Sequence, residues 1–263
     1  MSPFFSIITV SYNAETLIEG TIRSALAQNC DDFEIIVQDG GSQDSTLSRI
    51  PQDLRISVRS EPDRGIYDAM NKAVQRASGR YCIFMNCGDE FAADDVLERL
   101  RGRLVQAAEP SILYGDYQMD GVFYRQPDSI GEFYLYRTPL CHQSMAFSRE
   151  LFSAIGSFDL KYRIMADYDL TLKCFRAGVP FLRSDTLVCS YRGSGVSESK
   201  KGIKIKRKER SEIVKRYFSQ GRRMKYGFLL ALTLRRFRMW LFTGHAPRWF
   251  VKAYRSVINV INK

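Results

Sequence analysis

The chain has 263 residues, of which 45% are hydrophobic and 26% are charged, and its formal net charge is +10 at pH 7. These values are typical of a globular protein with a sizeable core, and they exclude a low-complexity or fibrous chain. The six cysteines lack CxxC spacing, and the first ten residues lack the basic start and apolar run of a signal peptide. We therefore expect a cytoplasmic protein with reduced thiols.

Charge divides the chain more sharply than any linker. Residues 200–263 hold 19 Lys and Arg against two acids, Glu209 and Glu212, which gives about +17 for this segment and about −7 for residues 1–199. We expect a main domain at residues 1–199 and a basic helical tail at residues 200–263.

Strands and helices alternate along the first part of the chain. Apolar runs predict strands at residues 4–10, 33–37, 55–59 and 80–85. Apolar residues at helical spacing predict helices at residues 15–28, 65–78 and 94–106. Strands linked by helices of this length imply right-handed crossovers and a mainly parallel sheet, so the predicted fold class is α/β. Short strands follow at residues 111–148, with a hairpin turn at Asp120 and Gly121.

Polar segments follow all four strands of the predicted sheet. They begin SYN after the first strand, DGGSQDST after the second, EPDRG after the third and NCGDE after the fourth. Such residues form ordinary turns, but ligands bind beyond the carboxyl ends of parallel strands in α/β sheets. Four polar strand ends at one edge therefore predict a ligand site.

The segments SIITVSYNAE, VQDGGSQDST, EPDRGIYDAMNKAVQRASGRY and FMNCGDEF resemble the nucleotide-sugar-binding half of inverting glycosyltransferases of family 2. The resemblance covers residues 4–197 in order, and it is closest to the bacterial exopolysaccharide and O-antigen branch that includes colanic-acid-type enzymes. It implies a GT-A fold with a single, mainly parallel nucleotide-binding sheet flanked by helices. It also implies transfer of a sugar from a nucleotide sugar, expected to be a UDP-sugar, to a lipid-diphosphate-linked saccharide acceptor.

The resemblance implies a role for each polar strand end in donor binding. Uridine would lie against the residues after the first strand, and Asp39 would accept a hydrogen bond from the base. The glycines after Asp39 let the backbone approach a ligand without a Cβ, although they also suit a tight turn. The implied nucleotide-sugar-binding residues are Ser11, Tyr12, Asn13, Asp39, Gly40, Gly41, Asp63, Gly65, Asn71, Lys72, Asn86 and Arg192.

A divalent metal is implied at the end of the fourth strand. The family commonly has a DxD or DxDD motif there, and its last carboxylate holds the ion. Here Asn86 and Gly88 replace the earlier acids, which leaves Asp89 as the ligand. Mg²⁺ or Mn²⁺ is expected, since Mg²⁺ accepts one or two protein carboxylates together with phosphate oxygens and waters. The resemblance also places His142 at the metal or the diphosphate. Alternatively, Asp89 caps the following helix and His142 is structural.

The segment ADYDL resembles the part of the family that holds the catalytic base, so Asp167 takes the position of the base and Asp169 is the second candidate. An inverting transfer needs one carboxylate to take the proton of the acceptor hydroxyl. Acids at the start of a helix are also favoured by its dipole, which is the structural alternative.

The segment YRGSGVSES, residues 191–199, resembles the family's glycine-rich loop over the diphosphate. Arg192 would offer a forked donor to phosphate, unless the segment is only a linker to the tail. The QxxRW-like motif of processive members is missing, which predicts one sugar added per encounter.

The basic tail predicts an attachment to membrane. Its longest apolar run, residues 226–234, is far shorter than the roughly 20 residues that a spanning helix needs. Basic residues mixed with Phe228, Trp240 and Trp249 suit helices that lie in the interface of an anionic membrane. We therefore expect a peripheral protein on the inner face of the cell membrane. A solvated helical face and a nucleic-acid site are the alternatives, and nucleic acid is not expected as a partner.

Two further classes compete with a transferase. A Rossmann dehydrogenase is disfavoured, because the first strand is followed by SYNAE and not by GxGxxG. A non-catalytic nucleotide-sugar-binding subunit of a polysaccharide assembly complex is the main alternative, because the metal motif is degenerate. The sequence indicates neither the donor sugar, nor the linkage, nor the oligomeric state.

Overall fold

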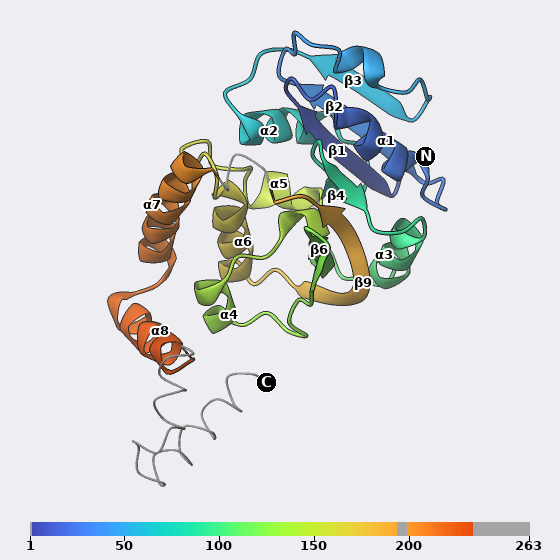
Figure 1. Cartoon of the computed structure of the whole chain (residues 1–263). Coiled ribbons are helices and arrows are strands. Elements are labelled where there is room, and N and C mark those ends of the chain that lie inside the picture. Colours follow the sequence, from blue (N-terminus) through green and yellow to red (C-terminus); the bar gives the residue numbers. More distant parts are fainter. Residues whose placement is uncertain (1, 194–198, 234–263) are drawn as a thin grey trace. The chain divides into compact units, whose positions relative to one another are not determined.

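The structure is a computed structural model, and it describes residues 2–193 and 199–233 (Figure 1). The strands are β1 (Phe5–Ser11), β2 (Phe33–Asp39), β3 (Ile56–Ser60), β4 (Tyr81–Phe84), β5 (Asp89–Phe91), β6 (Ile112–Met119), β7 (Val122–Tyr124), β8 (Met145–Ser148) and β9 (Phe181–Tyr191). The α-helices are α1 (Ile18–Leu26), α2 (Ile66–Arg76), α3 (Val96–Leu104), α4 (Glu132–Arg137), α5 (Glu150–Ala154), α6 (Ala166–Arg176), α7 (Lys200–Tyr217) and α8 (Gln220–Thr233). Two 3₁₀ turns are η1 (Leu47–Arg49) and η2 (His142–Ser144).

In the described part of the chain, nine strands form one sheet in the order β3-β2-β1-β4-β8-β6-β9-β5, with β7 paired to β6. The first four strands of this order are parallel, so their carboxyl ends meet at one edge. β8 is antiparallel to β4 and β6, β5 is antiparallel to β9, and β6 is parallel to β9. The predicted α/β fold is confirmed. Parallel pairing dominates only among β3, β2, β1 and β4, and the rest of the sheet is mixed.

After β4, two pairs of consecutive strands, β4 with β5 and β6 with β7, have no helix between them. β6 and β7 follow each other directly, and only an antiparallel pair can be joined by a two-residue turn. The predicted hairpin turn is confirmed at Asp120 and Gly121, whose φ angles are 51° and 77°. Positive φ at both central residues is the mark of a type I′ turn, which matches the twist of the strands it joins.

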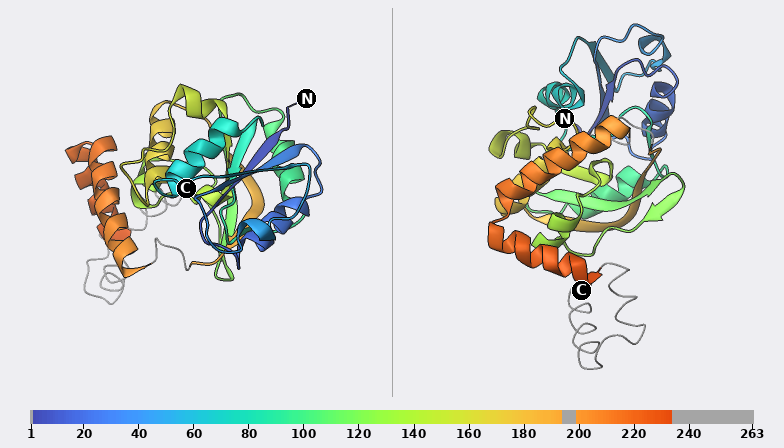
Figure 2. Two further views of the ribbon diagram at one scale, coloured as in Figure 1. Left: turned by 90° about the horizontal axis from the view of Figure 1, so that it is seen from above. Right: turned by 60° about the vertical axis from the view of Figure 1, so that its left-hand side comes forward.

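Helices cover both faces of the parallel half of the sheet. α1 and α3 pack on one face, where Ile18, Ile22 and Leu100 join a cluster with sheet residues such as Ile7 and Ile35. α2 lies on the opposite face, against β1 and β2 (Figures 1 and 2). The apolar stripe of each helix is therefore buried against the sheet, which leaves the polar strand ends at the edge.

The described residues divide into two compact units. Among them, unit 1 contains residues 2–131, 139–193 and 199–210, and unit 2 contains residues 132–138 and 211–233. The division expected from the sequence, a main domain at residues 1–199 and a tail from residue 200, stays a prediction. The first half of α7 bonds within unit 1 through Glu209, whose carboxylate accepts backbone hydrogen bonds from the segment before α6.

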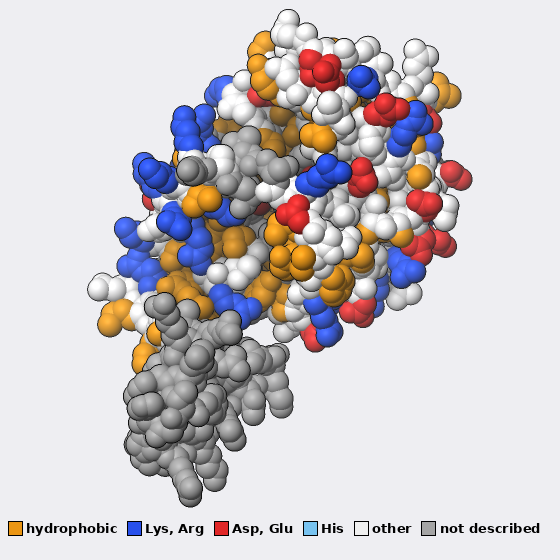
Figure 3. Space-filling view, in the orientation of Figure 1, with side chains coloured by type: hydrophobic (Ala, Val, Ile, Leu, Met, Phe, Trp, Pro, Cys, Tyr) orange, Lys and Arg blue, Asp and Glu red, His pale blue; other side chains and the backbone are white. Residues whose placement is uncertain are grey.

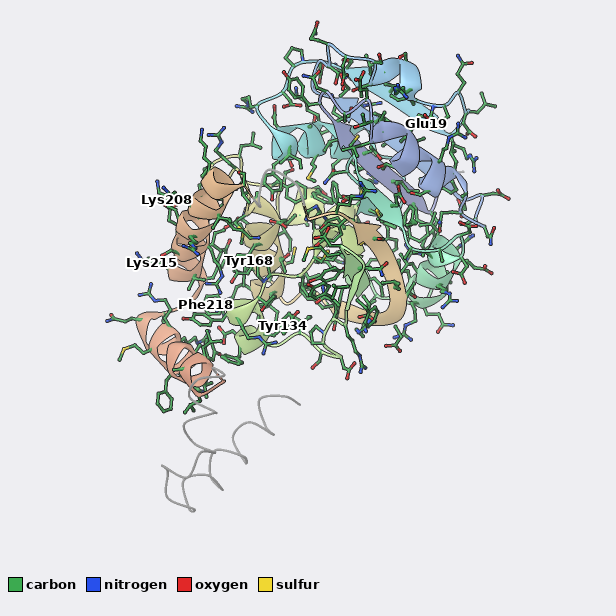
Figure 4. The ribbon with its side chains drawn as sticks, viewed as in Figure 1. Glu19, Tyr134, Tyr168, Lys208, Lys215 and Phe218 are labelled. Carbon is green, nitrogen blue, oxygen red and sulfur yellow. The ribbon has the colours of Figure 1, made fainter. Side chains whose placement is uncertain are left out.

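Unit 2 holds a small aromatic cluster. The ring of Tyr136 lies 5.3 Å from the rings of Phe218 and Tyr226, and Arg222 pairs with Glu132 at 2.6 Å. Figure 4 labels Phe218, which follows α7. Among the described residues, no helix combines the length and the apolar character that crossing a bilayer requires.

Candidate active site

Asp39, the last residue of β2, anchors its own turn. Its buried carboxylate accepts hydrogen bonds from three hydroxyls, those of Ser11 at 2.8 Å, Ser42 at 2.5 Å and Ser60 at 2.7 Å. The amides of Gly41 and Ser42 also donate to it. Burial raises the pKa of Asp39, but these hydrogen bonds outweigh burial and hold the pKa below its ordinary value. Asp39 therefore organises the strand end, and its contact with a base stays a prediction.

Tyr12 and Asp63 lie on either side of Gly40. A Cβ added at Gly40 would lie 2.5 Å from the Asp63 Oδ2 and 3.3 Å from the Tyr12 ring, so the close approach depends on glycine. The Tyr12 side chain is 65% exposed, and the Asp63 Oδ1 accepts a hydrogen bond from the amide of Gly65. This strand end thus presents an aromatic ring and a carboxylate at its surface.

Asn13 and Gly41 shape the backbone around this surface. Both have positive φ, 47° at Asn13 and 86° at Gly41. The Asn13 amide donates to the Ser42 hydroxyl, and its side-chain oxygen accepts from the amide of Gln43. The ends of β1 and β2 are therefore held together by hydrogen bonds between their loops.

The predicted residues on α2 make contacts within the protein. The side chain of Asn71 exchanges two hydrogen bonds with the backbone of Phe158, at 2.9 and 3.0 Å. The ammonium of Lys72 lies 2.8 Å from the carbonyl of Pro62 and 3.5 Å from Glu61. These contacts fix the loop before α2 and the segment before α6.

Asp89 is the first residue of β5 and is buried. Its Oδ2 accepts a hydrogen bond from the amide of Asn86 at 3.0 Å. Burial raises the pKa of Asp89 to about 6, against the opposing charge of His142. The alternative role as a helix cap is excluded, because α3 begins at Val96 and Asp95 precedes it.

The end of β4 fits a hard cation in its donor chemistry. Asn86 Oδ1 is buried and accepts no hydrogen bond from the described residues. A carboxylate oxygen and an amide oxygen suit Mg²⁺ or Mn²⁺ if phosphate oxygens and waters complete the shell. No cluster of three or more His, Cys, Asp or Glu suited to a metal occurs among residues 2–193 and 199–233. A cation at this position would therefore take most of its coordinating oxygens from a bound phosphate and from water.

His142 connects the end of β4 to the predicted base. Its Nε2 lies 3.4 Å from the side-chain nitrogen of Asn86, and its Nδ1 lies 3.0 Å from the Asp167 Oδ2. Burial lowers the pKa of His142, but the hydrogen bond and charge of Asp167 outweigh burial and raise the pKa above its ordinary value. Because the Nδ1 of His142 is hydrogen-bonded to Asp167, Nε2 is the ring nitrogen that faces the end of β4.

Asp167 and Asp169 occupy different environments in the first turn of α6. Asp169 is fully buried, and its Oδ2 lies 3.5 Å from the ammonium of Lys173. The side chain of Asp167 is 16% exposed, and its Oδ1 accepts a hydrogen bond from the amide of Tyr168. Burial raises the pKa of Asp167, but His142 and Tyr67 outweigh burial and lower it. Of the two predicted acids, Asp167 has the more exposed side chain, at 16% against 1% for Asp169.

Sequence reasoning missed Tyr67 on α2. Its buried hydroxyl lies 2.9 Å from the Asp167 Oδ1 and 2.7 Å from the carbonyl oxygen of Ile164. Burial, followed by the charge of Asp167, raises the pKa of Tyr67 well above its ordinary value, so the hydroxyl stays protonated. The sequence carries no signal for this contact, because Tyr67 and Asp167 are 100 residues apart.

The segment after β9 is described as far as Gly193. Its amide donates to the Asp120 Oδ1 at 3.0 Å, which ties the segment to the tip of the β6–β7 hairpin. Arg192 is exposed beside this tie. Residues 194–198 of the predicted glycine-rich loop lie outside the described residues. The phosphate contact of Arg192 stays a prediction.

Sequence comparison places this site in a known family. The profile of glycosyl transferase family 2 matches residues 6–155. A PGL/p-HBAD biosynthesis glycosyltransferase of Mycobacterium bovis is 32% identical over 180 residues, which are 66% of this chain and 70% of the relative. The putative teichuronic acid biosynthesis glycosyltransferase TuaG of Bacillus subtilis is 37% identical over 103 residues, or 37% of this chain and 41% of that protein.

Solved structures agree on the fold. TarS 1–349 of S. aureus in complex with UDP-GlcNAc has a TM-score of 0.64 at 18% identity, covering 93% of this chain and 73% of that chain. Glucosyl-3-phosphoglycerate synthase of Mycobacterium tuberculosis, in complex with Mn²⁺, UDP and phosphoglyceric acid, has a TM-score of 0.54 at 19% identity, covering 79% and 78%. Together with the profile match and the mixed sheet, these likenesses establish that the chain is a glycosyltransferase of family 2 with the GT-A fold.

Proposed function

We propose that this protein transfers a single sugar, with inversion, from a UDP-sugar to a lipid-linked saccharide in the synthesis of a bacterial surface polysaccharide. The observation that carries the proposal is the connection from Asp167 through His142 to Asn86. This connection sets a partly exposed carboxylate beside the strand end that suits a cation and a diphosphate.

Asp167 is the proposed general base. Because its pKa is low, it is ionised at neutral pH and free to accept a proton from the acceptor hydroxyl. As the proton moves to Asp167, the hydroxyl oxygen forms a bond to the anomeric carbon, and the bond from that carbon to the diphosphate breaks. Attack opposite the leaving group inverts the anomeric configuration. His142 holds the Asp167 Oδ2 in place during this step.

Asp89 and Asn86 are the proposed protein ligands of a divalent cation, Mg²⁺ or Mn²⁺. When bound, the cation would stabilise negative charge on the departing diphosphate. In support, two structural neighbours were solved with Mn²⁺, the glucosyl-3-phosphoglycerate synthase and a mannosyltransferase from Pyrobaculum calidifontis with GDP-Man. His142 remains a further candidate contact to the diphosphate through Nε2.

Two kinds of observation support the proposed classes of donor and acceptor, the residues at the end of β2 and the names of related proteins. Tyr12 and Asp63 beside Gly40 offer a face and an acceptor for uracil, and the TarS structure contains UDP-GlcNAc. Two relatives are named for PGL/p-HBAD biosynthesis and for teichuronic acid biosynthesis. The second name supports a role in polysaccharide synthesis, and the saccharide acceptor is part of the proposal.

The tail is proposed to bind the anionic inner face of the membrane. Lys and Arg gather over α7, and Lys208 and Lys215 lie seven residues apart on the same side of this helix (Figures 3 and 4). On α8, the side chains of Met224 and Phe228 are 69% and 66% exposed. Cations with exposed apolar side chains suit a headgroup interface. Of the residues predicted to enter the interface, Trp240 and Trp249 lie outside the described residues.

The test begins with UDP- and GDP-sugars in a thermal-unfolding screen with Mg²⁺ or Mn²⁺, because a ligand of the folded state raises the melting temperature. The stabilising donor is then incubated with lipid-linked saccharides, and the anomeric configuration of the product is read by NMR. Transfer with inversion supports the proposal. Stabilisation by a donor without transfer or donor hydrolysis would instead favour the non-catalytic subunit.

A further inference from the structure

Glu209 stands out in the basic tail because its carboxylate is buried. It is one of two acids in residues 200–263, and only 7% of the residue is exposed. Its Oε1 lies 2.7 Å from the amide nitrogen of Arg163, and its Oε2 lies 3.0 Å from those of Ile164 and Met165. A carboxylate that accepts three consecutive backbone amides is a rigid, charge-assisted contact between distant parts of the chain.

The three amides lead directly into the helix that carries the proposed base. Met165 precedes α6, and its apolar side chain makes no capping hydrogen bond. Glu209 brings a negative charge to this helix start, where the helix dipole favours it. Asp167 follows two residues after Met165, so the position of the segment 163–165 sets the position of the base.

Tyr67 on α2 also contacts the segment 163–165, through the carbonyl of Ile164. Its hydroxyl lies within hydrogen-bonding distance of the Ile164 carbonyl, while the Ile164 amide donates to Glu209. The Tyr67 hydroxyl also contacts the Asp167 Oδ1 directly. One residue, Ile164, is therefore bonded through its carbonyl to α2 and through its amide to α7.

We propose that Glu209 is a positioning residue for the base, so that the beginning of the basic tail completes the active site. Glu209 acts through the segment 163–165 and does not touch substrate. Residues 200–210 then have two functions, since they carry cations for a surface and hold Asp167 for the transfer step. This inference rests on the proposed role of Asp167.

The test compares two full-length variants, Glu209→Gln and Glu212→Gln. Both substitutions remove one negative charge from α7, but Glu212 is exposed, whereas Glu209 is buried and accepts the amides of the segment 163–165. Gln keeps the size of Glu and replaces one acceptor oxygen with a donor that clashes electrostatically with an amide. Circular dichroism and thermal unfolding confirm that both variants are folded at the assay temperature.

We expect Glu209→Gln to lower kcat by about 10- to 100-fold, the effect of moving a catalytic group by roughly 1 Å. UDP affinity is expected to stay within about twofold, because the nucleotide residues lie on other strand ends. Hydrogen exchange at the amides of residues 163–165 is expected to accelerate. Glu212→Gln is expected to match the wild type in all three measurements.

A second comparison uses Tyr67→Phe. Because both side chains hold Ile164, the losses in kcat for Tyr67→Phe and Glu209→Gln are expected to be non-additive in the double variant. Unchanged kcat and unchanged exchange in Glu209→Gln would overturn the inference. Equal losses of kcat and UDP affinity would also overturn it, since they indicate general disruption. If the wild type transfers no sugar at all, the proposed function fails, and the exchange measurement alone decides whether Glu209 orders the segment.

Discussion

The imidazole of His142 lies against the carboxylate of Asp167, with 3.0 Å between Nδ1 and Oδ2. Both side chains are largely buried, at 17% and 16% exposure, so their attraction is only weakly screened by solvent. The pair joins the 3₁₀ turn before β8 to the start of α6, and it gives the proposed base a fixed orientation.

Asp167→Asn is expected to abolish most transfer while donor binding survives. The amide cannot accept the acceptor's proton, so kcat should fall by roughly 10²–10⁴-fold, as for the loss of a general base. Calorimetric titration of UDP with Mn²⁺ should give an affinity close to that of the wild type. Asp169→Asn is a useful contrast, because that buried carboxylate faces Lys173, and its main expected effect is on stability. Transfer at the wild-type rate by Asp167→Asn would exclude it as the base.

Asp89→Asn is expected to remove the metal dependence of donor binding. A neutral amide is a poor substitute for a carboxylate at a hard cation, so adding Mn²⁺ should no longer tighten UDP binding. The measurement is a pair of UDP titrations, with and without Mn²⁺, for this variant and for Asp167→Asn. The second variant should keep the full difference. If Asp89→Asn keeps it as well, the end of β4 is not the metal site.

Gly40→Ala is expected to weaken UDP binding while the fold persists. The new Cβ would lie 2.5 Å from the Asp63 Oδ2, so the Asp63 side chain must move from its position at this strand end. A loss of about 1.4 kcal/mol would appear as a tenfold rise in Kd. The control is Gly102→Ala within α3, where no atom lies within 4 Å of the added Cβ. That control should keep UDP affinity and gain about 0.5–1 kcal/mol of stability.

Asp39→Asn is expected to destabilise the fold in a pH-dependent manner. Loss of a buried, multiply bonded carboxylate should cost about 1–3 kcal/mol at pH 7. Because the pKa of Asp39 is lowered in the folded state, its stabilisation is present above the unfolded pKa and disappears as pH falls through the folded pKa. Urea unfolding at pH 7 and at a pH below the ordinary aspartate pKa of about 3.9 should therefore show that the difference in unfolding free energy from the wild type shrinks in acid.

The control for this experiment is Asp185→Asn, whose side chain is 90% exposed. Its unfolding free energy should stay within about 0.5 kcal/mol of the wild type at both pH values. A penalty for Asp39→Asn that is equally large at neutral and acid pH would show that the charge of Asp39 is not what stabilises the turn.

Replacing both Met224 and Phe228 by Gln is expected to weaken binding to anionic liposomes. These exposed side chains are four residues apart on α8, so they lie on one face and can enter the interface together. Sedimentation with vesicles containing phosphatidylserine measures the effect, and Leu54→Gln, at an exposed apolar site outside the tail, is the control. If the wild type, the double variant and Leu54→Gln sediment equally with the vesicles, Met224 and Phe228 do not contribute to membrane binding.

Local chemistry was sufficient to predict the elements of the parallel half of the sheet, while the roles of the site residues stay predictions. The sequence indicated β1, β2, β3 and β4 to within two residues at either end. β1, β2 and β4 are buried, and buried parallel strands must be apolar on both faces, whereas β3 is a largely exposed edge strand with a weaker apolar pattern. The polar residues after these strands meet at one edge because parallel strands share their direction. The turn at Asp120 and Gly121 was predictable because few residues tolerate positive φ.

Only the tertiary structure decided which side chains meet. On α2, Ile66 fits the apolar stripe but is 43% exposed, whereas Tyr67 is buried with its hydroxyl at Asp167. Nothing in the sequence distinguishes solvent from protein as the partner of the Glu209 carboxylate, which in the structure accepts hydrogen bonds from the amides before α6. Side-chain periodicity reports the direction of burial within one element, but a hydrogen bond between residues 45 or 100 positions apart depends on how the elements pack.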